Sequence, residues 1–287
     1  MPNEKSLFLC HHGIKGMHWG QRHGPPYPLS KEVSRNIRIN RQYEYEKEPN
    51  KWMREYRDRY IASQAPPEKF EDLQRKTGRF TLDQDAQLVN DVFHRTKVGR
   101  LYNCQNCAAA VEMRARGYDV TARMRPDGSN VFNPEKWFDG GKFTMMDADD
   151  IVSDYIDDTK GTYDSDRYDK MCVQAYDRFT KTLSSQPIGS RGIVTVGWCA
   201  STDIQKRTSE FHAFNYIIRR DGLVFVDAEG RGKLYGGRPH VRTAQEYMDY
   251  KSPLNVDPRE YSYMRTDHLT PNESITEAVI SRKLVDK

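Results

Sequence analysis

The sequence predicts an α+β fold, in which helices come first along the chain and antiparallel strands follow. Three stretches carry this prediction: an alanine-rich segment at 103–117 with helical composition, a segment at 168–183 with helical spacing of apolar residues, and two apolar runs around a turn at 211–227. Helices and strands that are segregated along the chain are typical of α+β proteins.

The alanine-rich segment is predicted to be a helix that begins with two cysteines. Asn103 is a suitable N-cap residue, and Gly117 stands where a left-handed residue commonly ends a helix, before an expected strand at 118–120. Cys104 and Cys107 then fall in the first turn. Unpaired N–H groups and the helix dipole stabilise a thiolate there, so this position favours a nucleophilic cysteine.

A cysteine nucleophile needs a base, and the predicted hairpin supplies one. We expect strands at 211–218 and 223–227 joined by a turn at 219–222, with His212 as the base and Asp227 as the residue that orients it.

The register of this hairpin decides whether the histidine and the aspartate meet. If the whole of 219–222 forms the loop, Ile218 pairs with Leu223 and Asp227 becomes a diagonal neighbour of His212. A loop of Asp221 and Gly222 alone would place the aspartate too far away. The longer loop, or a bulge, is therefore predicted.

The motifs together resemble the papain-fold toxin family of glutamine deamidases, whose members occur in bacterial polymorphic toxins and in phage-encoded proteins. The resemblance covers about residues 80–270. It is carried by Asn103-Cys104-Gln105-Asn106-Cys107, Arg114-Ala115-Arg116-Gly117-Tyr118-Asp119-Val120, His212-Ala213-Phe214-Asn215 and Val224-Phe225-Val226-Asp227.

The resemblance implies a papain-like core, with a catalytic helix near its N-terminus packed on an antiparallel sheet. It implies a triad of Cys104 as nucleophile, His212 as base and Asp227 as orienter, which converts glutamine to glutamate in a host protein through a thioester. Cys107 is the alternative nucleophile. No cofactor and no metal are expected.

Two further residues belong to the predicted site. Asn103 is a candidate oxyanion donor beside the backbone N–H groups of the helix start. Glu229 would lie across from His212 in the longer-loop register and is the reserve orienter. The family is expected to have a glutamine at this position, so Glu229 is a departure from its pattern.

Other interpretations of the cysteines stay open. The same steps would cleave a peptide bond, which makes a cysteine protease an alternative. Cys104 and Cys107 are also compatible with a zinc site completed by Cys172 and Cys199, with a redox pair, or with inert thiols in a structural phage protein.

The composition of the N-terminal segment predicts that it docks onto another protein. Residues 9–24 are rich in histidine and glycine, contain apolar side chains, and resemble a short element of phage head-associated proteins. We therefore expect a capsid or portal partner, and a location in the virion, the bacterial host cytoplasm or both. Binding of zinc or copper by the histidines and Cys10 is the alternative.

We expect three regions: an irregular docking segment at 1–29, a helical extension at 30–66 and the papain-like catalytic domain at 67–287. In the extension, Trp52 and Tyr56 belong to an aromatic stripe, which is expected to pack on the parent domain rather than to bind nucleic acid.

Composition excludes several classes of protein. The chain has 287 residues, a net charge of +4 and a mean hydropathy of −0.88. It contains no apolar run of eighteen residues and no recognisable signal peptide, so we expect no membrane partner. Its five cysteines suit a reducing compartment. The charge is too small to indicate nucleic-acid binding.

The remaining elements are predicted from the spacing of apolar residues and from residues that commonly begin or end helices and strands. We expect short helices at 83–94 and 244–250, an acidic solvated helix near 147–158, a central strand at 192–198, an edge strand at 261–267 and a terminal helix at 271–287 capped by Asn272.

Overall fold

The computed structural model divides the chain into two compact units. It describes residues 66–90, 103–123, 133–198, 211–229, 241–251 and 256–284. The sheet unit contains the described residues of 140–226 and 241–269, and the cysteine unit contains those of 66–139, 227–229 and 270–284. The predicted docking segment and helical extension, with Trp52 and Tyr56, lie outside the described residues.

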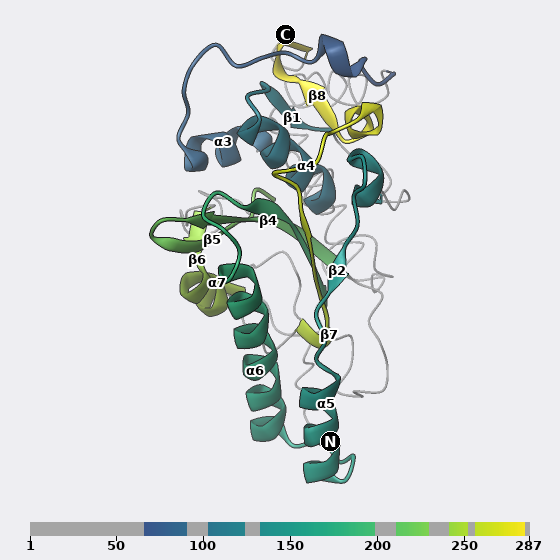
Figure 1. The fold of residues 1–287 in the computed structure, drawn as a ribbon, viewed down its shortest axis with the longest axis vertical. Helices are drawn as coiled ribbons and strands as arrows, with labels where there is room; N and C mark the ends of the chain where they lie inside the picture. The colour runs from purple at the N-terminus through teal and green to yellow at the C-terminus, as the bar shows by residue number, and fades with distance from the viewer. Residues whose placement is uncertain are drawn as a thin grey trace, which may run out of the picture. The chain divides into compact units, whose positions relative to one another are not determined.

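The sheet unit is built on six antiparallel strands in the order β2-β7-β3-β4-β5-β6. The strands are β2 (Thr144–Met145), β3 (Arg191–Trp198), β4 (Phe211–Arg219), β5 (Gly222–Val226), β6 (Val241–Thr243) and β7 (Val256–Arg265). Its helices are α5 (Asp149–Thr159), α6 (Ser165–Ser184) and α7 (Ala244–Lys251), and α5 lies beside α6 (Figure 1).

Helix α6 covers the sheet with one apolar face. Met171, Ala175 and Phe179 follow the predicted helical spacing and are buried in one core with residues of β3, β4, β5 and β7. The Phe179 ring lies 4.9 Å from the Tyr261 ring on β7 and 6.5 Å from the Phe225 ring on β5, measured between centroids. The helical periodicity therefore identified this core face correctly.

The β4–β5 hairpin has the register that the longer loop predicted. Ile218 pairs with Leu223, and Arg219 pairs with Gly222, so the turn itself is only Arg220 and Asp221. The last pair joins Asn215 to Val226. Strand β5 thus ends one residue before Asp227, which had been predicted as the final residue of the strand.

One of the predicted strands differs from expectation in its place in the sheet. Strand β3 is central, as predicted, because β4 and β7 flank it. Strand β7, predicted at 261–267 as an edge, is longer and internal: it lies between β2 and β3. The reason is strand β2, in which Thr144 pairs with Tyr263 and Met145 with Ser262. This strand is too short to be recognised from the sequence.

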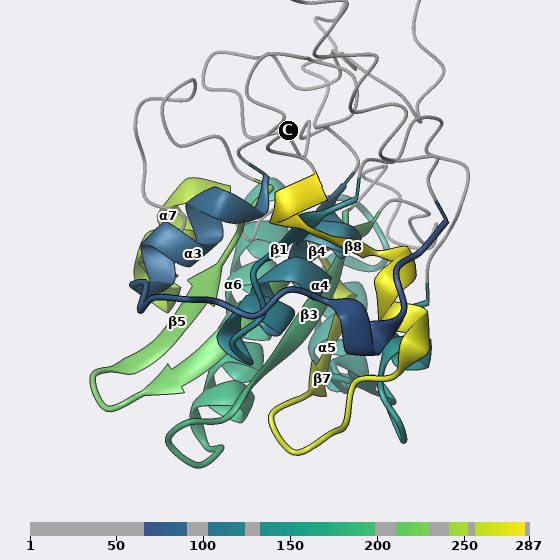
Figure 2. The same ribbon diagram turned by 90° about the horizontal axis from the view of Figure 1, so that it is seen from above.

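The cysteine unit is organised around α4 (Cys104–Ala115), which contacts α3 (Leu82–Val89), β1 (Val120–Ala122) and β8 (Val279–Ser281). Strands β1 and β8 form an antiparallel pair beside α4 (Figure 2). Short 3-10 turns complete the unit: η1 (Phe70–Asp72), η3 (Pro134–Trp137), η5 (Glu273–Glu277) and η6 (Arg282–Leu284).

Helix α4 ends as the sequence predicts, but the next strand starts later than expected. Gly117 has a φ of 90°, the left-handed conformation that glycine adopts without strain. The strand begins at Val120 rather than at Tyr118.

The predicted terminal helix at 271–287 is wrong. Asn272 does cap a helical turn, since its side chain accepts the Ser274 N–H at 3.1 Å, but η5 is short and strand β8 comes after it. Val279 and Ile280 are apolar β-branched residues, and their burial against β1 outweighs the helical tendency of the segment.

A buried guanidinium holds α4 to its surroundings. The Arg114 side chain is fully buried, and it donates to Asp85 on α3 at 3.0 Å and to Asp119 at 2.7 Å. Lys76 adds a contact to the same Asp85 carboxylate at 2.6 Å. Because one cation bridges two carboxylates, the end of α4, the start of α3 and the loop before β1 are fixed together.

Within the described residues, no helix has the length and apolar composition that crossing a membrane requires.

Gly192 on β3 should not tolerate a side chain. A Cβ atom there would lie 2.0 Å from the Met264 carbonyl oxygen of β7 and 2.7 Å from the Tyr216 ring of β4. We expect Gly192→Ala to lower the free energy of unfolding by at least about 2 kcal/mol, measured by urea denaturation.

Gly78→Ala is the matched control, because its Cβ would meet only the Phe80 ring at 4.0 Å. Equal stability of the two variants would contradict the strand packing described for β3.

Candidate active site

Cys104 is the first residue of α4, and its thiol is almost buried, with 8% of the residue exposed. The helix begins here because the Asn103 carbonyl accepts the first helical hydrogen bond, from the Cys107 N–H at 2.8 Å. The thiol thus stands among the N–H groups that have no partner within the helix. This is the placement predicted from the alanine-rich segment.

Asn103 occupies the N-cap position but does not cap the helix with its side chain, contrary to the prediction. Its φ of −105° and ψ of 12° are not those of a typical N-cap residue, and no side-chain cap bond forms. The residue is fully buried, and within the described part of the chain neither Oδ1 nor Nδ2 has a hydrogen-bond partner.

Glu229 takes over the capping role from a distant part of the sequence. Its Oε1 accepts the backbone N–H of Asn103 at 2.8 Å, and the residue is 8% exposed. In a capping box this acceptor would be the third helical residue, here Asn106. The Asn106 amide instead donates to the Arg123 carbonyl at 3.0 Å, which leaves the position to Glu229.

Cys107 lies one turn further into α4 and is 1% exposed. Burial raises the pKa of its thiol well above the ordinary value, and the negative charges of Glu229, Cys104 and Asp227 raise it further. A thiol in this environment stays protonated at neutral pH and is a poor nucleophile.

The predicted base and orienter lie at the ends of the two hairpin strands. His212 is the second residue of β4, pairs with Val196 of β3, and is buried with its ring centroid 5.7 Å from that of Phe214. Asp227 is the first residue after β5 and is buried as well.

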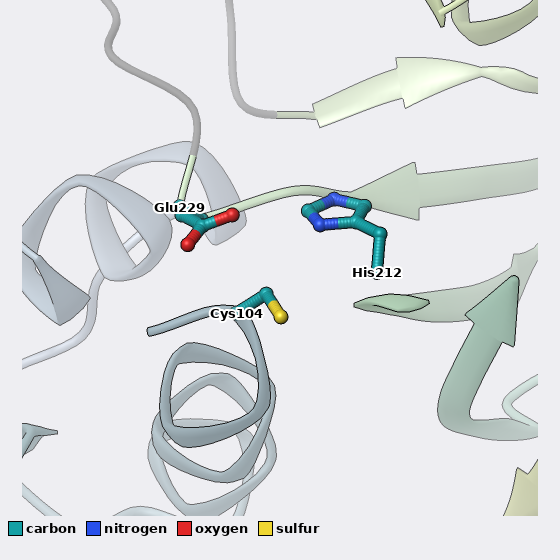
Figure 3. Close-up of side chains that lie close together, drawn as sticks. All are labelled: Cys104, His212 and Glu229. Carbon is teal, nitrogen blue, oxygen red and sulfur yellow. The ribbon is translucent and has the colours of Figure 1, made fainter. Parts of the chain in front are cut away.

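Figure 3 shows the side chains of Cys104 at the start of α4, His212 on β4 and Glu229 beyond β5. A thiol, an imidazole and a carboxylate are the groups of a cysteine hydrolase, and they are also donor types that zinc accepts. Of the other cysteines in the alternative zinc interpretation, Cys172 is a core residue of α6 whose Sγ lies 3.9 Å from the Val256 carbonyl oxygen. Cys199 lies outside the described residues.

An α+β fold with a cysteine at the start of a buried helix and a histidine on an antiparallel strand is consistent with a papain-like cysteine hydrolase. Residues 102–232 match the family described as papain fold toxin 1, glutamine deamidase. The resemblance drawn from the motifs is therefore confirmed over this segment.

A second match covers the N-terminus. Residues 2–26 match a family of unknown function, DUF7211. This match assigns no role, so docking of residues 9–24 to a phage capsid or portal stays a prediction. Neither a curated protein nor a solved structure matches the chain.

The environment of Cys107 predicts a clear pH dependence. Because its pKa is raised, its neutral thiol persists to higher pH than that of an ordinary cysteine, so iodoacetamide should leave it unmodified in the folded protein at pH 7 to about 8. It should react readily once urea unfolds the chain. Peptide mass spectrometry of both samples measures this. Rapid labelling of Cys107 in the folded protein would contradict the burial described above.

Proposed function

We propose that the protein is a papain-like cysteine hydrolase that converts glutamine side chains of a protein substrate to glutamate. The single observation that carries the proposal is the position of Cys104, at the first residue of a buried helix inside the segment that matches the glutamine deamidase family. His212 and Asp227, the other two members of the proposed triad, lie within the same matched segment.

The proposed reaction has two halves. His212 takes the proton of the Cys104 thiol, and the thiolate attacks the carbon of the carboxamide. The C–N bond breaks, and ammonia leaves with a proton from the imidazolium. His212 then removes a proton from water, which attacks the thioester, releases glutamate and restores the thiol. Asp227 holds the imidazole in the required orientation.

The chain path supports the pairing of this histidine with this cysteine. The strand that carries His212 pairs with β5, and β5 leads directly into Asp227. Two residues later, Glu229 binds the N–H of Asn103, the residue before Cys104. Asp227 and Glu229 thus follow the hairpin directly along the chain.

Cys104 is a better nucleophile than Cys107 for two reasons. It lies at the very end of the helix, where the dipole effect is largest, whereas the other thiol lies a turn deeper and is less exposed. The raised pKa of Cys107 also disfavours its thiolate. We therefore assign the attack to Cys104.

The oxyanion of the tetrahedral intermediate needs donors close to the nucleophile. Backbone N–H groups at the start of α4 supply them, and the buried Asn103 amide is the candidate side-chain donor. These donors act without reorganisation because the helix holds the backbone groups in place.

Substitution of the proposed catalytic residues tests the function. Glutamine-containing proteins of a bacterial lysate are the substrate, and the readouts are released ammonia and the mass increase of each converted glutamine. Cys104→Ser and His212→Ala should each lower the rate by roughly a thousandfold or more, because they act as one unit.

Cys107→Ala is the matched control and should retain the rate of the unmodified protein. Retained activity in Cys104→Ser would transfer the nucleophile to Cys107. Cleaved peptide bonds in place of converted glutamines would show a protease, and no turnover with any protein of the lysate would favour a structural role.

A further inference from the structure

Burial of the Asn103 side chain in the cysteine unit carries a free-energy cost that the described residues do not offset. Both of its polar atoms are buried without a hydrogen-bond partner among the described residues. Leaving buried polar groups unpaired is destabilising. The next residue along the chain is Cys104, the proposed nucleophile. A ligand that binds beside this thiol would supply the missing partners.

The asparagine side chain takes no part in capping α4, and the backbone of this residue is held by Glu229. An N-cap asparagine ordinarily uses its side-chain oxygen to accept an N–H of the first turn. Here the start of α4 is tied instead through the backbone, by the bond from the Asn103 N–H to Glu229. Figure 3 shows the Glu229 carboxylate beside the first residue of α4.

We propose that Asn103 recognises the primary carboxamide of the substrate through both Oδ1 and Nδ2, and that Glu229 is the positioning residue that fixes the backbone from which this amide projects. The inference rests on the proposed function and deepens it, because it names the residue that selects glutamine side chains over peptide bonds.

The selection depends on the shape of the two kinds of amide. A primary carboxamide has one N–H on the same side as its carbonyl oxygen, so it donates and accepts toward a single partner amide, as Asn103 offers. A trans peptide bond has its N–H and C=O on opposite sides and cannot make both bonds to one side chain. A peptide bond at this site would leave one asparagine atom buried and unpaired.

This recognition is compatible with the attack. The two hydrogen bonds lie in the plane of the carboxamide, whereas a thiolate approaches its carbon from above or below that plane. As the carbon becomes tetrahedral, Nδ2 continues to donate to the developing oxyanion, and the bond from the leaving nitrogen to Oδ1 is released together with ammonia.

Two small alkylating reagents test the inference without the natural substrate. Iodoacetamide carries a primary carboxamide, and N-methyl-iodoacetamide carries the corresponding secondary amide with a trans N–H. Both form a C–S bond and release iodide. The ratio of their rates at Cys104, followed by peptide mass spectrometry, is compared with the ratio for glutathione.

We expect the ratio at Cys104 to exceed that of glutathione about fivefold, which corresponds to one hydrogen bond of ordinary net strength. Asn103→Ala should bring it down to the glutathione value, because the variant slows iodoacetamide, which loses two hydrogen bonds, more than N-methyl-iodoacetamide, which loses one. Asn103→Asp, which has nearly the same shape but lacks the donor, should give the same loss.

Asn106→Ala is the matched control. It removes another buried amide of the same helix, one that is bound to the Arg123 carbonyl, and should leave the ratio unchanged. The inference would be overturned if the ratio at Cys104 of the unmodified protein equalled that of glutathione, or if Asn103→Ala left the ratio unchanged. Either result would still show that Cys104 is a reactive thiol. A Cys104 that reacts with neither reagent would overturn the proposed function itself.

Variants of Glu229 test its positioning role separately. Glu229→Gln keeps an oxygen that accepts the Asn103 N–H and should preserve the ratio, whereas Glu229→Ala should lower it toward the glutathione value. Glu68→Ala is the control, since Glu68 also accepts a backbone N–H, that of Ser281 at 2.7 Å. A Glu229→Ala protein that loses thermal stability but keeps the ratio would show a structural role only.

Discussion

The structure of the candidate site depends on how the first turn of α4 satisfies its backbone N–H groups. Those groups have no helical partner, and a buried helix end that lacked other partners would be costly. A carboxylate from a distant segment, Glu229, binds the first of these groups, the Asn103 N–H, whereas the Asn103 side chain caps none of them. The thiol of Cys104 keeps the favourable helix-end environment, and the amide of the residue before it has no hydrogen-bond partner in the described part of the chain.

The same helix is fixed at its other end by charge. Arg114 is fully buried between Asp85 and Asp119, so α4 is held by hydrogen bonds at both termini and by small apolar contacts along its alanines. Alanine side chains lose no rotamer freedom on burial and allow neighbouring elements to approach closely. Cys104 on such a helix is held in one position, which suits the nucleophilic role that we propose for it.

Several features could be predicted from the sequence because they depend on local chemistry. The alanine content and Gly117 located α4, and the spacing of apolar residues located α6 with its buried face. The pairing of Ile218 with Leu223 was expected from the longer hairpin loop. The motif around Cys104 identified the family that residues 102–232 match. The misassigned elements, β7 as an edge and 271–287 as a helix, depend on strands two or three residues long, and such strands leave no periodicity to recognise.

The sequence alone identified the chemical groups that we propose for the site: a cysteine at the start of a helix, a histidine on a strand and an aspartate at the end of the returning strand. Only the tertiary structure decided that Glu229, expected as a reserve orienter, binds the Asn103 N–H, that Asn103 does not cap its own helix, and that Cys107 is too buried to ionise readily. The physical reason is that capping partners and desolvation depend on segments more than a hundred residues apart, whereas helix propensity and motif spacing are properties of neighbours.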